Sequence, residues 1–492
     1  MVFSDLFFIF VFLSGCIFLY FIPDAVNCIL SRKISNKALL NIKNGVLILF
    51  SILFYAWGEP AYIFLFLFST LFNYIAGLAI EKYRNGTGAR ITIVASLVFN
   101  IGMLFVFKYT GFFIENINAL FGTSIPDPEI RLPIGISFFT FQIMSYIIDC
   151  YWEKVEVQRS YPKLLLYISM FPQLVAGPIV RYSTVEREIS DRKSTLQDVS
   201  EGVTRFVVGL SKKVIFANGL YSVVENLLGV YSAETQSLGD TLAGKSFFAT
   251  FMGVVCFALY VYYDFSGYSD MAIGIGRIFG FHFDENFKHP FISKNITEFW
   301  QRWHISLGSF FRDYLLYVPL FGKRRKYFSL FLVWFCTGFW HGASWNFIIW
   351  GLYFGAFVFA EQLIGKKRMK KIPPVVTNMY SLLVIIIGFG IFFFEDLTDL
   401  GIFFKNLVFA NGNAFIAASD KSTVMNNIFL IAVAAVFSMP ILPWFKNKLK
   451  DAPGIVATVA SVATTVSTVI LLLICAVLLA ENTTNPFLYF RF

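Results

Sequence analysis

The sequence predicts an all-α, polytopic integral membrane protein, and three observations support this prediction. Of the 492 residues, 57% are hydrophobic and only 14% are charged, which is unlike a soluble globular domain. Apolar runs of roughly 20 residues, long enough for a helix to cross a hydrocarbon layer of about 30 Å, recur from one end of the chain to the other. Basic residues gather between those runs. A segment in lipid has to satisfy its own backbone polar groups, so these runs predict helices.

Several stretches are simple candidates for membrane spans. They are 5–30, 45–57, 60–80, 91–108, 132–150, 203–228, 246–263, 376–394, 426–443 and 455–480. The first lacks a basic leading segment and a small-residue cleavage site, so we expect a retained span and no signal peptide. With the irregular segments described next, we expect about 11 to 13 transmembrane helices plus re-entrant and amphipathic helices. We expect them to form a single membrane-embedded domain over 1–492, divided into N-terminal spans (1–130), a central core (131–365) and C-terminal spans (366–492).

Three further stretches are less regular. Residues 164–180 contain the pairs Phe171-Pro172 and Gly177-Pro178, which break a helix, so we expect a re-entrant element there. Residues 266–280 are rich in Gly and Ser and predict a short buried helix. Residues 327–360 would form a helix roughly 51 Å long, too long for one span and too short for two. We therefore expect a hairpin of two short helices that breaks within 337–346.

The basic loops indicate the orientation of the chain. With the N-terminus outside, the positive-inside rule places about 30 of the 40 Lys and Arg residues in cytosolic loops. These loops lie at 32–43, 82–90, 154–163, 181–193, 282–326, 366–371 and 446–450. The net charge of +9 is then explained by membrane topology, and we expect no nucleic-acid partner. The six cysteines show no CxxC pairing, so we expect neither disulfides nor a thiolate zinc site.

His304, one of only four histidines, follows a helix-start signal. Asn295 and Glu298 have the spacing of a capping box. Apolar residues then recur at helical spacing, with polar residues on the opposite face. The apolar residues are Trp300, Trp303, Leu307, Phe310 and Tyr314, and the polar residues are Arg302, Ser306, Ser309 and Asp313. We predict one amphipathic helix at the cytosolic boundary, where Gly308 leaves room for a ligand to reach the imidazole. The alternative is an interfacial histidine that packs beside tryptophans.

His341 stands in the expected hairpin, where the 34 residues from Tyr327 to Ala360 contain no Asp, Glu, Lys or Arg. An ionisable group at membrane depth is a functional candidate by default. The alternative is a packing histidine bonded to a backbone carbonyl. A neutral imidazole can take the proton from a hydroxyl group that attacks a thioester, so the two histidines suit acyl transfer.

Other signals are weaker. Asp264 and Asp270 lie in an apolar region and either pair helices or orient a histidine. None of the four histidines has a second histidine three to five residues away, so we expect no metal site. The serine-elbow and ATP-binding loop patterns are absent, which argues against a serine hydrolase and an ATP-driven pump.

At these residues the sequence resembles the membrane-bound O-acyltransferase (MBOAT) family, specifically its bacterial alginate O-acetyltransferase-like branch. The matching blocks are LPIGISFFTFQIMSYIIDCY (132–151), FPQLVAGPIVRY (171–182), DFSGYSDMAIGIGRIFGF (264–281), ENFKHPFISKNITEFWQRWHISLGSFFRDYL (285–315), GFWHGASWNFIIWG (338–351) and NPFLYFRF (485–492). One departure is the basic run at 318–326, where the branch usually has a Gly-Gly-Asn-rich loop.

The resemblance implies a helical fold with a pore-like centre in a bacterial plasma membrane. It implies that His341 is the catalytic base and His304 its catalytic partner on the cytosolic side. The implied donor is acetyl-CoA or another acyl thioester, with no bound cofactor. The implied acceptor is an extracellular polysaccharide, reached directly or through an extracytoplasmic partner acetyltransferase of the SGNH-hydrolase-like kind. The expected substrate-binding residues are Trp300, Arg302, Trp303, Asp313 and Asn346.

Three alternatives to polysaccharide acetylation stay open. The D-alanyl transferases of teichoic acid share the histidine blocks and are the nearest alternative within the family. A polytopic transporter that relays protons through the histidines would show pseudo-symmetric halves, and we find no internal repeat. A structural scaffold would tolerate alanine at both histidines.

Overall fold

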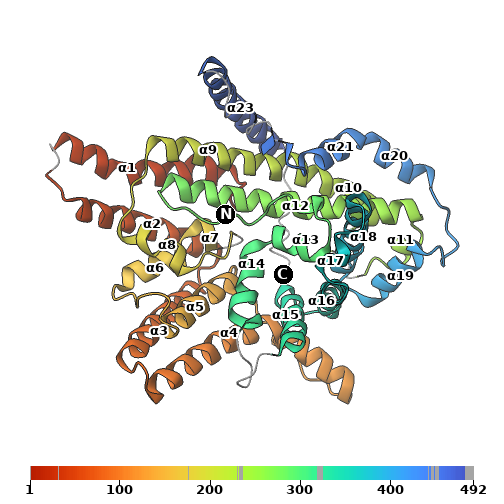
Figure 1. Cartoon of the computed structure of the whole chain (residues 1–492), viewed down its shortest axis with the longest axis horizontal. Coiled ribbons are helices and arrows are strands. Elements are labelled where there is room, and N and C mark those ends of the chain that lie inside the picture. The colour runs from red at the N-terminus through yellow and green to blue at the C-terminus, as the bar shows by residue number, and fades with distance from the viewer. Residues whose placement is uncertain are drawn as a thin grey trace. The chain divides into compact units, whose positions relative to one another are not determined.

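The computed structural model describes residues 2–30, 33–174, 177–229, 231, 237–317, 325–441, 443–444, 448 and 454–481. The regular secondary structure of these residues is helical, with no strand among them, which confirms the predicted all-α class (Figure 1). Two features singled out in the sequence, the block 485–492 and most of the basic run 318–326, lie outside the described residues.

Nine described helices are long and apolar enough to cross a membrane, and a bent helix pair raises the number to ten. This is fewer than 11 to 13 because some predicted crossings are shorter or broken. The stretch 132–150 forms a helix of only 16 residues, and 426–443 belongs to the bent pair, whose members meet at 57°. The chain is thus a multi-pass membrane protein, as expected.

The chain divides into two compact units, each described by itself. Unit 1 comprises Met1–Gly209 and Tyr268–Glu285. Its helices are η1 (Phe8–Leu13), α1 (Ser14–Ile29), α2 (Asn36–Gly58), α3 (Ile63–Lys82), α4 (Thr87–Phe121), α5 (Ile136–Tyr151), α6 (Tyr161–Ser169), α7 (Phe171–Leu174), α8 (Tyr182–Ser190), most of α9 (Leu196–Ser211) and the end of α12 (Phe247–Ile278).

Buried polar groups pair the helices of unit 1. Asn73 of α3 accepts hydrogen bonds from Asn100 (2.9 Å) and Ser96 (2.6 Å) of α4, and all three side chains are fully buried. The predicted break in 164–180 is present, because α6 ends at Ser169 and only the single turn of α7 follows. A Cβ atom on Gly177 would lie 2.8 Å from the backbone of the preceding turn, so only glycine fits there.

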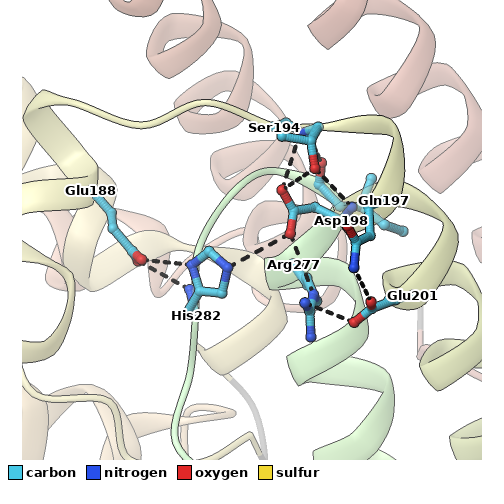
Figure 2. A network of polar contacts seen from close by, with 9 residues as sticks. Glu188, Ser194, Gln197, Asp198, Glu201, Arg277 and His282 are labelled. Carbon is cyan, nitrogen blue, oxygen red and sulfur yellow. Dashed lines mark hydrogen bonds and ion pairs between the residues drawn. The ribbon is translucent and has the colours of Figure 1, made fainter. Parts of the chain in front are cut away.

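A charged network joins α8, α9 and the end of α12 within unit 1 (Figure 2). The imidazole of His282 lies between two carboxylates, with Nδ1 2.7 Å from Glu188 and Nε2 3.8 Å from Asp198. Arg277 adds ion pairs to Asp198 (3.5 Å) and Glu201 (2.7 Å). His282 is therefore part of a polar junction between helices.

The separate short helix predicted at 266–280 is wrong, because this stretch is the end of the 32-residue helix α12. Its glycines serve close packing and do not break the helix. A Cβ atom on Gly274 would lie 2.6 Å from the carbonyl oxygen of Gly202 and 2.7 Å from the backbone nitrogen of Phe206. Small residues at helix contacts let two backbones approach, as is typical in membranes.

Unit 2 comprises Leu210–Gly267 and Asn286–Phe492. Its helices are η2 (Lys212–Ala217), α10 (Asn218–Leu228), α11 (Gly239–Ala243), the first part of α12, η3 (Pro290–Ile292), α13 (Ile296–Arg302), α14 (Ile305–Phe311), η4 (Arg312–Leu316), α15 (Lys326–His341), α16 (Trp345–Ile364), α17 (Lys366–Met369), α18 (Pro374–Phe393), α19 (Leu397–Leu407), α20 (Ala418–Asn426), α21 (Ile428–Phe437) and α23 (Gly454–Glu481).

The two carboxylates near the middle of α12 both pair with cations, which favours their helix-pairing interpretation. Asp264 forms an ion pair of 2.6 Å with Lys213 of η2 in unit 2, and both side chains are 1% exposed. Asp270 forms an ion pair of 2.8 Å with Arg205 of α9 in unit 1, and Arg205 also binds Glu285.

Candidate active site

The α15–α16 hairpin has the form that the sequence predicts. Helix α15 ends at His341, the chain is extended at Gly342, and α16 begins at Trp345. The two helices pack side by side (Figure 1). Glycines permit this contact, because a Cβ atom on Gly338 would overlap the carbonyl oxygen of Phe347 on α16. His341 therefore stands at the turn of a tight helical hairpin.

Aromatic rings surround His341 on several sides. Its imidazole centroid lies 4.9 Å from the ring of Trp340, 4.9 Å from that of Trp350 and 5.5 Å from that of Phe392, all at angles of 75–83°. The side chain stays partly exposed. Edge-to-face contacts of this kind fix the orientation of the imidazole, and part of the side chain remains exposed.

His304 lies at a break between two helices, so the single amphipathic helix predicted over this region is wrong. The capping box at the start of α13 is confirmed, since Asn295 accepts a hydrogen bond of 2.7 Å from the backbone N–H of Glu298 and Glu298 accepts one from Lys294. Helix α13 nevertheless ends at Arg302, and His304 adopts a left-handed conformation (φ 43°) before α14 begins. A positive φ in a residue other than glycine indicates local strain.

The environment of His304 holds one orientation of the ring. Asn286 Oδ1 accepts hydrogen bonds from the backbone N–H (3.2 Å) and hydroxyl (2.9 Å) of Ser306 and lies 3.2 Å from His304 Nδ1. The Oδ1 atom of Asn286 accepts a hydrogen bond from a backbone N–H, and an amide oxygen can only accept. The Nδ1 atom of His304 must therefore be the donor, so we assign the ring proton to Nδ1 and the lone pair to Nε2. Nε2 has no hydrogen-bond partner among the described residues. The edge of Phe265 packs on the ring at 4.7 Å.

His304 is only 1% exposed, so the expectation that Gly308 leaves a ligand room to reach this imidazole is wrong. Burial lowers the pKa of His304 from 6.5 to about 3, because the charged imidazolium would lose its hydration. The imidazole is therefore neutral at physiological pH. Its ring centroid lies 6.0 Å from that of Trp340, so Trp340 packs against both histidines.

The structure brings two of the five predicted substrate-binding residues next to the histidine site. Trp300 packs against Trp350 at 5.4 Å, and Trp350 in turn contacts His341. Asn346 is fully buried and donates to the carbonyl oxygens of Ile391 (3.4 Å) and Phe392 (3.3 Å). Its Oδ1 atom has no hydrogen-bond partner in the described part of the chain.

The other three predicted residues have different surroundings. Trp303 is buried in an aromatic core, stacked on Phe299 at 5.5 Å. Arg302 forms an ion pair of 2.9 Å with Glu298 one turn earlier on α13. Asp313 forms an ion pair of 2.8 Å with its neighbour Arg312.

Sequence reasoning missed the residues that fix the two imidazoles. Asn286 lies 18 residues before His304 in the chain, and only its place in a matching block marked it. Phe392 comes from α18, far from the hairpin in sequence. Within the described ranges, no group of three His, Cys, Asp or Glu side chains could hold a metal ion.

The chain is similar to several known proteins. The MBOAT, membrane-bound O-acyltransferase, family matches residues 153–398. The chain is 32% identical to the probable alginate O-acetylase AlgI of Azotobacter vinelandii over the full length of both chains. It is 36% identical to the peptidoglycan O-acetyltransferase of Helicobacter pylori over 63% of this chain and 62% of the relative. It is 30% identical to the teichoic acid D-alanyltransferase of Bacillus subtilis over 52% of this chain and 65% of the relative.

Proposed function

We propose that this chain, which belongs to the membrane-bound O-acyltransferase family, moves an acetyl group from a cytosolic thioester to hydroxyl groups of an extracellular polysaccharide. It is an acyltransferase, as its family and its acetyltransferase-named relatives show. Two of these relatives are named for alginate and for peptidoglycan, which supports a glycan acceptor. Acetyl-CoA is the donor we expect.

The observation that carries the proposal is the position of His341. It stands at the turn of the α15–α16 hairpin, is partly exposed, and is fixed by Trp340, Trp350 and Phe392. A general base needs a fixed orientation and contact with its substrate; the aromatic contacts of this imidazole support the first and its partial exposure supports the second. General-base catalysis of this kind accelerates a reaction by about 10²–10⁴-fold.

The proposed reaction needs only the acceptor hydroxyl, the thioester and the His341 imidazole. The acceptor hydroxyl gives its proton to the His341 imidazole while its oxygen bonds to the thioester carbonyl carbon. The tetrahedral intermediate then expels the thiolate, and the C–S bond breaks. The imidazolium returns the proton to the thiolate, so the products are an ester and a thiol and the base is regenerated.

We assign His304 a positioning role. It is buried, its Nδ1 is held by Asn286, and its ring packs near Trp340, which also packs on His341. A neutral, oriented ring supports the indole without placing a charge in the apolar wall. Trp300 and Asn346 are the substrate-binding residues best supported by position, since each contacts a residue of the wall around His341.

The remaining parts of the proposal rest on the resemblance and on charge. Arg302, Trp303 and Asp313 are predicted to line the donor path. The basic loops favour a bacterial plasma membrane protein with its N-terminus outside. An SGNH-like acetyltransferase on the outer side is the proposed partner for the final transfer.

The test is complementation of a strain that lacks the gene. Wild-type chain should restore acetate esters on the surface polysaccharide, and His341→Ala should restore none at equal membrane abundance. His282→Gln, which changes a histidine of unit 1 in the junction of Figure 2, is the matched control and should restore them. Release of D-alanine in place of acetate would identify a D-alanyl transferase. Full acetylation by His341→Ala would contradict the proposal.

A further inference from the structure

A polar cavity of about 920 Å³ lies in unit 1, away from the residues discussed so far. It lies where helices α3 and α5 end. The rest of its wall is formed by the segment between α5 and α6 and by one side of α8. Val155, Val157 and Tyr182 are buried residues at its base. The volume is within the range of small-molecule sites, but the lining is mostly charged.

Part of this charge is already neutralised. Arg84 forms an ion pair of 3.2 Å with Glu153, and Arg159 forms one of 3.0 Å with Glu81. These pairs tie the end of α3 to the chain after α5. Lys154, another cation of the lining, lies 3.8 Å from Asp149.

The cations that remain are Lys163 and Arg187, and both lie near one stretch of α8. The Nζ atom of Lys163 donates a hydrogen bond of 2.9 Å to Ser190, which is three residues after Arg187 and so on the same helix face. Neither has an ion-pair partner among the described residues. A phosphate group between them would receive charge-assisted hydrogen bonds from both.

The acids that remain are Glu156 and Glu186, which are neighbours in space. The carboxylate of Glu186 accepts a hydrogen bond from the backbone N–H of Glu156. Burial, together with the charge of Glu156, raises the pKa of Glu186. Glu186 interacts electrostatically with Arg187, and Glu156 with Arg159, but no described cation lies within ion-pair distance of either carboxylate. Two close carboxylates of this kind make a favourable place for an ammonium group.

The residues that flank the cavity are typical of the headgroup region of a membrane. The membrane-spanning helix α3 ends at Lys82, directly before the exposed ring of Tyr83. Trp152 is exposed on the other flank, with the ammonium group of Lys154 4.4 Å from its ring centroid. Exposed Tyr and Trp beside Lys are typical of the membrane–water interface.

We propose that this cavity binds the headgroup of a zwitterionic phospholipid, with its phosphate on Lys163 and Arg187 and its ammonium group on Glu156 and Glu186. The mixture of charges selects a ligand that carries both signs. An anionic lipid without an amine would leave the two carboxylates uncompensated, and so would a soluble polyphosphate. The site is independent of the acyl-transfer proposal.

The test uses the full-length chain, delipidated in detergent and titrated with phosphatidylethanolamine or phosphatidylglycerol, with bound lipid counted by native mass spectrometry. Wild type should retain phosphatidylethanolamine about tenfold better than phosphatidylglycerol. The double variant Lys163→Gln, Arg187→Gln should lose about tenfold in phosphatidylethanolamine retention. The matched control Lys366→Gln, Lys367→Gln, on α17 of unit 2, should retain it like wild type.

A second variant keeps the test decisive if the first fails to fold. Glu156→Gln, Glu186→Gln should shift the preference toward phosphatidylglycerol. Equal retention of the two lipids by wild type would overturn the proposal, as would unchanged selectivity in this variant. A competition experiment compares soluble ADP with soluble O-phosphoethanolamine as displacers of bound phosphatidylethanolamine. If ADP acts at the lower concentration, the site prefers a cytosolic polyphosphate and the proposal is overturned.

Discussion

The indole ring of Trp340 lies 6.0 Å from the imidazole ring of His304, between centroids. The same indole lies 4.9 Å from His341, its neighbour in the chain. One aromatic side chain therefore packs against a buried histidine and a partly exposed one. Trp340 thus connects His304, between α13 and α14, to His341, at the turn of the α15–α16 hairpin. We expect the geometry of the site to depend on this tryptophan.

Trp340→Ala should impair both stability and acyl transfer. The indole is 5% exposed, and removing a buried tryptophan costs about 3–5 kcal/mol. Trp340→Phe keeps an aromatic ring beside both imidazoles and should retain more of both properties. Thermal unfolding in detergent and polymer ester content report the two effects. Wild-type activity in Trp340→Ala would show that the indole does not orient His341.

Gly338→Ala should destabilise the hairpin. Its Cβ atom would overlap the carbonyl oxygen of Phe347, so α15 and α16 would have to separate at a cost of about 1–3 kcal/mol. Gly401→Ala on α19 is the control, since a Cβ atom there meets nothing within 4 Å, and it should be neutral or slightly stabilising. The melting temperatures of the two variants provide the comparison. Equal melting temperatures would argue against a close helix crossing.

Protein stability should fall as the pH drops from about 6.5 toward 3 because of His304. Burial lowers its folded-state pKa to about 3, while the unfolded chain titrates near 6.5, so between these values only the unfolded state binds the proton. The contribution is at most about 1.4 kcal/mol per pH unit. His304→Gln should unfold with a shallower pH dependence than wild type in this window. Identical pH profiles would show that folding does not lower the pKa of His304.

The ion pair of Lys213 with Asp264 should tolerate joint replacement better than single replacement. Both side chains are 1% exposed, so either single change removes the ion-pair partner of a buried charge and costs about 3–5 kcal/mol. The double variant Lys213→Met, Asp264→Leu removes both charges and should unfold close to wild type. A double variant less stable than both single variants would refute this account.

Periodicity and charge predicted the parts of the site that depend on local sequence. The hairpin was predicted because a stretch without charged residues is too long for one membrane span and too short for two. The capping box was predicted from the spacing of Asn295 and Glu298. The break at His304 was missed because apolar residues keep helical spacing across it. The stabilising contact from Asn286 is tertiary, so no local pattern reveals it.

The same limit explains the error at the end of α12. The Gly- and Ser-rich stretch 266–280 predicted a short separate helix, but Gly274 packs against the backbone of α9 at Gly202, and that contact depends on the fold. The roles of Arg302, Trp303 and Asp313 stay predictions.

The central claim is that His341 accepts the proton of the acceptor hydroxyl during acyl transfer, and inside-out membrane vesicles test it most directly. Isotope-labelled acetyl-CoA, which does not cross the membrane, is added to the exposed cytosolic face, and labelled ester is measured in the lumen. Wild type and Gly401→Ala should transfer label at equal rates, whereas His341→Gln should be slower by at least about 10²-fold at equal abundance. Transfer by His341→Gln at the wild-type rate would contradict the claim.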